Sequence, residues 1–174
     1  MRIAVAREAD PMESRVAATP ETVKKMMGLG AEVHVEPGAG LKSGVPDKEF
    51  AAAGATIAGG ACKDADVILK VRRPTASELS GYKKGALVMA LMDPYGQDAA
   101  VREMANAGIT AFAMELMPRI TRAQTMDVLS SQANLAGYRA VIDAAAEYGR
   151  GLPMMMTTSG LKADFSSGAY MVAT

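Results

Sequence analysis

Residues 1–36 read MRIAVAREADPMESRVAATPETVKKMMGLGAEVHVE, and this stretch decides the fold. Residues 2–6 form an apolar run with β-branched side chains, which predicts a short strand. Thr19-Pro20-Glu21 then supplies an N-cap, a first helical residue and an acidic residue in the first turn, so these residues predict the start of a helix. Gly28 and the residues after it predict the end of this helix. Residues 32–36 alternate apolar and polar side chains, as a second strand should. The stretch therefore predicts one β-α-β unit.

The same alternation of strands and helices continues as far as residue 113. Apolar runs predict further strands, and amphipathic runs between them predict helices. The expected strands are 55–57, 66–71, 86–91 and 109–113, and the expected helices are 46–53 and 98–107. This alternation is typical of the α/β class, so we expect a Rossmann-like or flavodoxin-like parallel sheet with helices on both faces.

The pattern changes after Met114. Residues 115–125 lack periodicity, whereas residues 130–148 carry apolar side chains near helical spacing and predict the longest helix of the chain. Residues 159–174 are rich in Gly, Ser and Ala and are expected to be loosely structured. We therefore divide the chain into an α/β domain over 1–128, a long C-terminal connecting helix over 129–150 and a final segment over 151–174.

The composition excludes several classes of protein. The chain has 174 residues, 49% of them hydrophobic and 22% charged, which excludes disorder over its whole length. Lys plus Arg and Asp plus Glu are both 19, and this zero net charge argues against nucleic acid as the main partner. A single cysteine excludes an internal disulfide and fits a reducing compartment, and a single histidine argues against a zinc site. The sequence shows neither an apolar run of membrane-span length nor a signal peptide.

Three features that could carry chemistry are better explained by structure. Gly38-Ala39-Gly40 follows a strand, but a dinucleotide-binding fingerprint needs its glycine turn to enter a helix directly. Residues 42–46 resist continuing a helix, so we expect a flexible turn there. His34 lies inside an alternating strand and is expected to be half exposed. Cys62 lies beside Lys63, which could activate a thiol, but an inert small residue is the expected role.

Arg15 and Lys70 are candidate anion-binding residues. Arg15 lies in the polar loop after the first strand, and Lys70 lies at the C-terminal end of an apolar strand. Ligands of open parallel sheets bind outside the carboxyl ends of the strands. Two cations there could hold a carboxylate or a cofactor phosphate, and spacing alone favours this interpretation no more than ordinary surface charge.

Residues 118–132, PRITRAQTMDVLSSQ, form the most unusual segment of the chain. They place Arg, Gln, Asp and Ser between a strand and a long helix, where loops often carry function. A glutamine amide can both donate and accept hydrogen bonds and suits a carboxamide, while an arginine can orient an aspartate or contact an anion. A helix-capping loop, with Asp127 or Ser130 as the N-cap, is the structural alternative.

Residues 118–127 and 129–141 resemble the NAD(H)-binding alpha subunit of the proton-translocating nicotinamide nucleotide transhydrogenases. The early motifs Arg15-Val16-Ala17, Gly38-Ala39-Gly40 and Lys70-Val71 support this resemblance, which runs from Met1 to about Thr158. The related alanine dehydrogenases share the fold and the early motifs, whereas the Arg-Gln-Asp loop is a transhydrogenase feature. The resemblance thus implies an alanine dehydrogenase/transhydrogenase N-terminal domain over 1–128.

The resemblance also implies roles for individual residues. In the family the loop reaches over the nicotinamide held by a Rossmann domain, so Arg119, Gln124, Asp127 and Ser130 are the expected cofactor-binding residues. Arg15 and Lys70 match positions that hold the substrate carboxylate in alanine dehydrogenases. Those enzymes use a catalytic histidine after the strand that matches residues 86–91, where this sequence has Met92-Asp93-Pro94-Tyr95. We therefore expect no catalytic residue on this chain alone, and no metal.

The function that the resemblance implies belongs to a complex. A Re/Si-specific NAD(P) transhydrogenase transfers hydride between NAD(H) on the alpha subunit and NADP(H) on a partner subunit, coupled to proton translocation. The expected partners are a Rossmann-type NAD-binding domain and the membrane and NADP-binding subunits. The expected location is cytoplasmic, peripheral to the inner membrane in the complex. The isolated chain is expected to be inactive.

A departure from the family lies in residues 151–174, where the start of a Rossmann domain is expected but its Gly-rich turn is missing. The surfaces on which that half would dock are expected to be apolar and to favour a homodimer. Two alternatives remain. One is an alanine dehydrogenase-type oxidoreductase fragment, which the missing histidine disfavours. The other is a non-catalytic binding or interaction module derived from the same fold.

Overall fold

The computed structural model describes residues 1–149, so the predicted final segment over 151–174 lies outside the described residues. Contacts divide the chain into one unit over Met1–Met117 and a second unit that begins at Pro118. The first unit contains the sheet, and the second contains a loop and the longest helix. The functional boundary expected at residue 128 stays a prediction.

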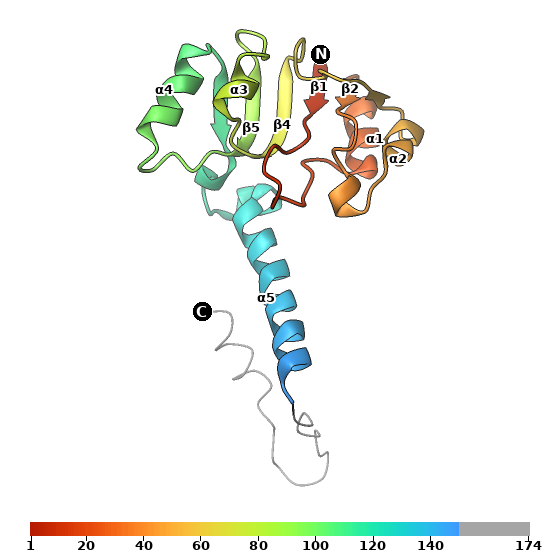
Figure 1. The fold of residues 1–174 in the computed structure, drawn as a ribbon, viewed down its shortest axis with the longest axis vertical. Coiled ribbons are helices and arrows are strands. Elements are labelled where there is room, and N and C mark those ends of the chain that lie inside the picture. The colour runs from red at the N-terminus through yellow and green to blue at the C-terminus, as the bar shows by residue number, and fades with distance from the viewer. Residues whose placement is uncertain (150–174) are drawn as a thin grey trace. The chain divides into compact units, whose positions relative to one another are not determined.

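Six parallel strands form the sheet of the first unit (Figure 1). In sequence order the strands are β1 (Arg2–Val5), β2 (Glu32–Val35), β3 (Thr56–Ile57), β4 (Val67–Arg72), β5 (Leu87–Leu91) and β6 (Thr110–Ala113). Their spatial order is β3-β2-β1-β4-β5-β6, which is the order of the doubly wound Rossmann fold. The central register pairs Ala4 with Ile68 and Ile68 with Val88. The predicted fold class is confirmed.

Four α-helices connect these strands. They are α1 (Pro20–Gly28), α2 (Asp47–Ala52), α3 (Ala76–Leu79) and α4 (Asp98–Asn106), with short 3₁₀ turns η1 (Leu41–Ser43) and η2 (Met114–Leu116). The predicted cap of α1 is confirmed, because the Thr19 hydroxyl accepts a hydrogen bond from the Thr22 N–H at 3.2 Å. Helix α3 was not predicted. It begins with a capping box, in which Thr75 and Glu78 satisfy each other's backbone N–H groups.

Each face of the sheet carries its own core. Val5, Val33 and Val35 point toward α1 and α2 and pack with Val23 and the fully buried Phe50. The neighbouring strand positions point to the other face, where the core residues include Ala4, Ile68, Val88, Leu79 and Met104. Because successive strand residues face opposite sides, the alternation of Ala4 and Val5 builds both cores at once. Helices on both faces were predicted and are confirmed.

Apolar side chains remain accessible at the β6 edge of the sheet. Val88 and Ala90 of β5 are buried, whereas Met89 between them is only half buried. Phe112, which pairs with Met89 across the β5–β6 ladder, is 40% exposed. Met89 and Phe112 are therefore accessible apolar side chains at this edge, and the apolar docking surface and the homodimer expected from the sequence stay predictions.

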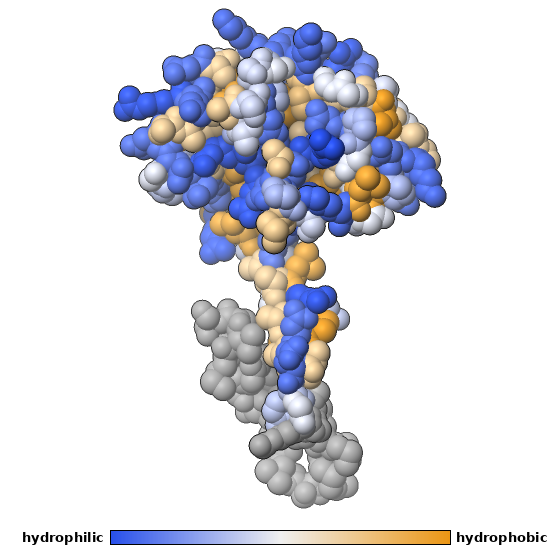
Figure 2. All heavy atoms as spheres, viewed as in Figure 1, coloured by the Kyte–Doolittle hydropathy of each residue, from blue (hydrophilic) through white to orange (hydrophobic). Residues whose placement is uncertain are grey.

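The second unit contains the 3₁₀ helix η3 (Thr121–Met126) and the 20-residue helix α5 (Val128–Glu147). No residue of α5 is buried, and Leu135 and Tyr138 are among its most exposed side chains. Figure 2 shows apolar and polar side chains mixed along this helix. Among the described residues, no helix is both long and apolar enough to cross a membrane.

Candidate functional site

The strand order brings the loops after β1 and β4 together. These strands are neighbours, and the connections from them serve opposite halves of the sheet. Such a topological switch point is where doubly wound sheets bind their ligands, outside the carboxyl ends of the strands. Here that position is occupied by charged side chains from three segments, namely Glu8, Glu13, Arg15, Lys70, Arg72 and Glu78.

Lys70 is held within this switch-point cluster. Its Nζ lies 2.6 Å from Glu78 Oε1 and 3.7 Å from Glu8 Oε2, and its side chain is 1% exposed. The second oxygen of Glu78 accepts the Thr75 N–H at 2.8 Å within the capping box. Burial opposes ionisation of Glu78, but the hydrogen bonds from Lys70 and Thr75 outweigh it and lower its pKa. An anion that bound Lys70 would therefore compete with a carboxylate that α3 holds in place.

Arg15 is paired in the same way. Its Nε and Nη2 lie 2.7 Å from the two oxygens of Glu13, and the Nε of Arg72 approaches the same carboxylate at 3.0 Å. Glu13 is only 5% exposed, and the hydrogen bond from Arg15 is the main reason that its pKa falls to about 2. The structure thus places Arg15 and Lys70 in the same charged cluster, each with a carboxylate partner. Their role in anion binding stays a prediction.

Two cavities open beside the switch-point cluster. One of about 460 Å³ is lined by Arg7, Glu13, Arg15, Glu36 and Lys42, among others. The other, of about 440 Å³, lies over β4 and β5 and is lined by Lys70, Arg72, Arg73 and Asp93, among others. Both mix cations with carboxylates. Within residues 1–149 no group of three or more His, Cys, Asp or Glu side chains is placed to hold a metal ion.

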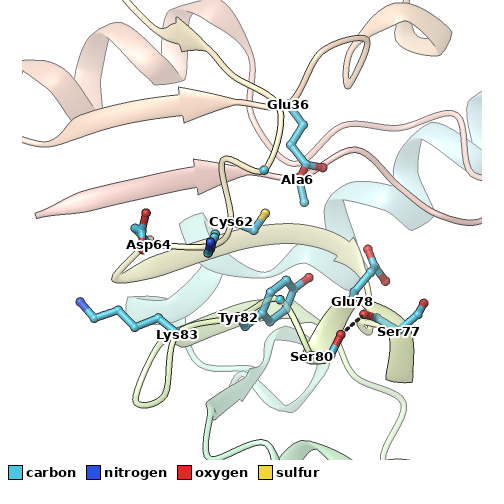
Figure 3. A pocket seen from close by; sticks show the side chains of 12 residues that line it. Ala6, Glu36, Cys62, Asp64, Ser77, Glu78, Ser80, Tyr82 and Lys83 are labelled. Carbon is cyan, nitrogen blue, oxygen red and sulfur yellow. Dashed lines mark hydrogen bonds between the residues drawn. The ribbon is translucent and has the colours of Figure 1, made fainter.

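A third cavity, of about 610 Å³, lies between the loop before β4 and α3 (Figure 3). Figure 3 shows the Cys62 sulfur and the Tyr82 ring among the residues that line this cavity, together with Glu36 and the α3 residue Glu78. Burial, followed by the charge of Glu36, raises the pKa of the Cys62 thiol to about 12. A thiol with this pKa is protonated at neutral pH, so the prediction that Cys62 is inert agrees with the structure.

The glycine turn after β2 is used for packing. The N–H of Gly38 donates to both oxygens of Asp47, at 2.9 and 3.1 Å, and is therefore already satisfied. A Cβ on Gly40 would lie 2.6 Å from the Val45 carbonyl oxygen and 2.7 Å from the Phe50 ring. Gly40 is thus required by close approach of the chain to itself, which agrees with the predicted turn and not with a phosphate site.

Sequence reasoning missed the carboxylates of this region. Glu8, Glu13 and Glu78 neutralise the two predicted cations, and Glu115 accepts the backbone N–H groups of Met92 and Asp93 after β5. Only Glu78 had a readable signal, since Thr-x-x-Glu is a capping-box pattern. Glu13 lies only two residues from Arg15 and was overlooked, whereas the contacts of Glu8 with Lys70 and of Glu115 with Met92 join residues far apart in the sequence and depend on the strand order.

The predicted cofactor-binding residues all lie in the second unit. Asp127 is the N-cap of α5, and it accepts hydrogen bonds from the Ser130 N–H at 3.0 Å and the Ser130 hydroxyl at 2.6 Å. These bonds lower the pKa of Asp127. Arg119 Nε lies 3.9 Å from the same carboxylate, and Gln124 is exposed on η3. The structure therefore joins Arg119, Asp127 and Ser130, and leaves the Gln124 amide facing solvent.

Comparisons with known proteins identify related chains. The family model described as alanine dehydrogenase/PNT, N-terminal domain, matches residues 4–136. An NAD(P) transhydrogenase subunit alpha chain of Rhodospirillum rubrum is 51% identical over 92% of this chain, which spans 44% of that protein's length. A solved transhydrogenase from Sinorhizobium meliloti is 64% identical over 91% of this chain and 48% of its own, with a TM-score of 0.86. A solved L-alanine dehydrogenase, 23% identical, matches 87% of this chain and 44% of its own with a TM-score of 0.74, which shows a common fold.

Proposed function

Since the chain belongs to the alanine dehydrogenase/PNT N-terminal domain family, we propose that it is the N-terminal part of the NAD(H)-binding alpha subunit of a proton-translocating NAD(P) transhydrogenase. The chain spans less than half the length of the transhydrogenase relatives described above. The proposed activity therefore belongs to a complex in which hydride passes between NAD(H) and NADP(H). The contribution of this chain is the loop over residues 118–127.

The organisation of that loop is the observation that carries the proposal. Asp127 caps α5 and is bonded twice by Ser130, which fixes the end of the loop on a rigid helix. The side chain of Arg119 is 70% exposed beside it, and Gln124 is exposed. An exposed amide that can donate and accept, next to an exposed cation, fits the carboxamide of a nicotinamide. This donor set supports the assignment of Arg119, Gln124, Asp127 and Ser130 to NAD(H).

Bound nicotinamide cofactors supply the hydride chemistry, and the groups of this chain position them. Gln124 would hold the carboxamide and so set the rotation of the ring. Asp127 orients Arg119, and the loop as a whole would exclude water from the space above the ring. Holding two reactants in near-attack geometry supplies a large part of many rate enhancements. The loop thus contributes orientation and provides no group that gains or loses a proton.

Amino-acid oxidation is the less favoured function. The stretch after β5, where alanine dehydrogenases carry a histidine, reads Met92-Asp93-Pro94-Tyr95 and contains none, and Lys70 is engaged by Glu78. The proposed partners are a Rossmann-type NAD-binding domain and the membrane and NADP-binding subunits, with the complex at the cytoplasmic face of the inner membrane. An assay of the completed two-domain protein with alanine and NAD should therefore yield no pyruvate.

Calorimetric titration with NADH tests the proposal. We expect weak or undetectable binding to the chain alone, and binding when the Rossmann-type partner is added. Removal of the Gln124 amide by Gln124→Ala should weaken the partner-dependent binding, whereas Asn106→Ala, an exposed amide on α4, should leave it unchanged. Equal affinity for NADH in the Gln124→Ala and Asn106→Ala assemblies would show that the loop does not contact the cofactor.

A further inference from the structure

The two residues that follow β5 are held by charged side chains from distant parts of the first unit. The carboxylate of Glu115 accepts the Met92 N–H, at 2.9 and 3.1 Å from its two oxygens, and also accepts the Asp93 N–H. From the other side, Arg73 Nη1 donates to the Met92 carbonyl at 2.8 Å and to the Asp93 carbonyl at 3.0 Å. A cation and an anion thus clamp the backbone of one dipeptide.

The clamped dipeptide has an unusual backbone. Asp93 has a φ of +44° and is the one non-glycine residue with positive φ within residues 1–149. An L residue reaches this region at a cost, and such a conformation persists where surrounding groups hold it. Two N–H groups directed at one carboxylate also form the arrangement that proteins use to bind anions. Here the bound anion is Glu115, so the strain at Asp93 and the position of Glu115 depend on each other.

Glu115 connects this clamp to the start of the loop. It lies in η2, which packs against β5, and Pro118 follows it by three residues in the sequence. Three residues of extended chain span at most about 10 Å. The attachment of Glu115 to the backbone after β5 therefore limits where the loop over residues 118–127 can begin.

We propose that Glu115 is a positioning residue for the nicotinamide loop. Its carboxylate fixes η2 on the Met92–Asp93 backbone, and the strained turn at Asp93 together with Arg73 keeps that attachment point rigid. Glu115 itself contacts no cofactor and acts through the loop that follows it. The inference rests on the proposed function, because it assigns to Glu115 the placement of residues that would contact NAD(H).

The first arm of the test measures the clamp in the full chain by amide hydrogen exchange. Glu115→Gln keeps the size of the side chain but removes its charge, and charge-assisted hydrogen bonds are about twice as strong as neutral ones. We expect the Met92 and Asp93 amides to exchange at least about tenfold faster in this variant, with the Val88 amide inside β5 unchanged. The matched control is Glu103→Gln on α4, because Glu103 lines the same cavity as Arg73 and Asp93 without holding the backbone after β5. Unchanged exchange at Met92 and Asp93 would overturn the proposal.

The second arm measures hydride transfer by the chain reconstituted with the remaining transhydrogenase parts. Because a displacement of about 1 Å can cost about a hundredfold in rate, we expect Glu115→Gln to slow transfer at saturating NADH by about tenfold or more. The affinity for NADH should fall less than in Gln124→Ala, because the displaced loop keeps all of its hydrogen-bonding groups. Glu103→Gln should transfer hydride at the unmodified rate.

A rescue distinguishes positioning from general stabilisation. Glycine adopts positive φ without strain, so Asp93→Gly added to Glu115→Gln should lower the cost of the turn enough for the weaker, neutral amide oxygen to hold η2 on the backbone after β5. We expect this double variant to recover most of the lost transfer rate, and a failure to recover would overturn the proposal. If Gln124→Ala slows hydride transfer and Glu115→Gln does not, only the proposed role of Glu115 is refuted. If neither variant slows hydride transfer, both the proposed function and the proposed role of Glu115 are refuted.

Discussion

Replacing Glu13 by glutamine should destabilise the fold at neutral pH and abolish one part of its acid sensitivity. Glu13 is buried between Arg15 and Arg72, and its pKa falls from an ordinary 4.5 to about 2 because of the hydrogen bonds from Arg15. That difference corresponds to about 3 kcal/mol of folding free energy. The side chains of Arg15 and Arg72 are 37% and 58% exposed, so solvent screening reduces the expected effect to about 2 kcal/mol.

The direction of the pH dependence follows from the lowered pKa. A carboxyl group that is more acidic in the fold stabilises it at every pH above the unfolded value of 4.5. This stabilisation is lost as the pH falls from 4.5 toward about 2, because the unfolded chain takes up the proton first. The difference between the unmodified chain and Glu13→Gln should therefore be constant at pH 5–7 and shrink toward zero near pH 2.

Urea unfolding followed by circular dichroism at several pH values measures this difference. The matched control is Glu21→Gln, whose partner Lys25 is 73% exposed and whose own side chain is 78% exposed. The two side chains of an exposed pair of this kind are largely screened by solvent, so the control should change little. Equal stability of the Glu13→Gln and Glu21→Gln variants at pH 7, or a difference that does not shrink in acid, would refute the reasoning.

Three further predictions concern Lys70, Cys62 and the exposed apolar surface. Lys70→Met leaves the carboxylates of Glu8 and Glu78 without their cation and should cost about 3 kcal/mol in urea unfolding, whereas a loss below about 1 kcal/mol would show that the cluster is not coupled. Cys62, with a pKa of about 12 and 6% exposure, should be alkylated at pH 7 only as fast as the fold opens, so labelling as rapid as that of a free thiol would contradict its burial. Sedimentation should show association that increases with concentration, with Phe112→Ser weakening it; a monomer at all concentrations would exclude the homodimer.

Local signals made the first β-α-β unit predictable. The N-cap Thr19, Pro20 and the alternation in β2 act within a few residues, and the structure places each element within one or two residues of the prediction. Helix α3 was missed by the sequence analysis because four residues are too few to show a periodic pattern, even though its capping box is visible in the sequence. The 3₁₀ helix η3 was missed because the apolar side chains of residues 121–126 show no helical periodicity.

The charged cluster could not be predicted in the same way. Lys70 and Arg15 were identified as candidates from their places after strands. The partner of Arg15, Glu13, lies two residues away in the same loop, whereas the pairing of Lys70 with Glu8 depends on which strands are neighbours. Glu8 and Lys70 are 62 positions apart and meet only because β4 pairs with β1. The backbone clamp of Glu115 likewise requires β5 to end beside η2. Pairings of this kind are properties of topology, which local sequence patterns do not contain.

The rate of hydride transfer in the reconstituted complex tests the central claim most directly. The chain is combined with the Rossmann-type and NADP-binding parts, and transfer between NADH and NADP is followed for the unmodified chain, Gln124→Ala and the control Asn106→Ala. Loss of one hydrogen bond of about 1.4 kcal/mol corresponds to about a tenfold slower transfer in Gln124→Ala, with the control unchanged. Equal rates for all three chains would contradict the assignment of this domain's loop to the nicotinamide.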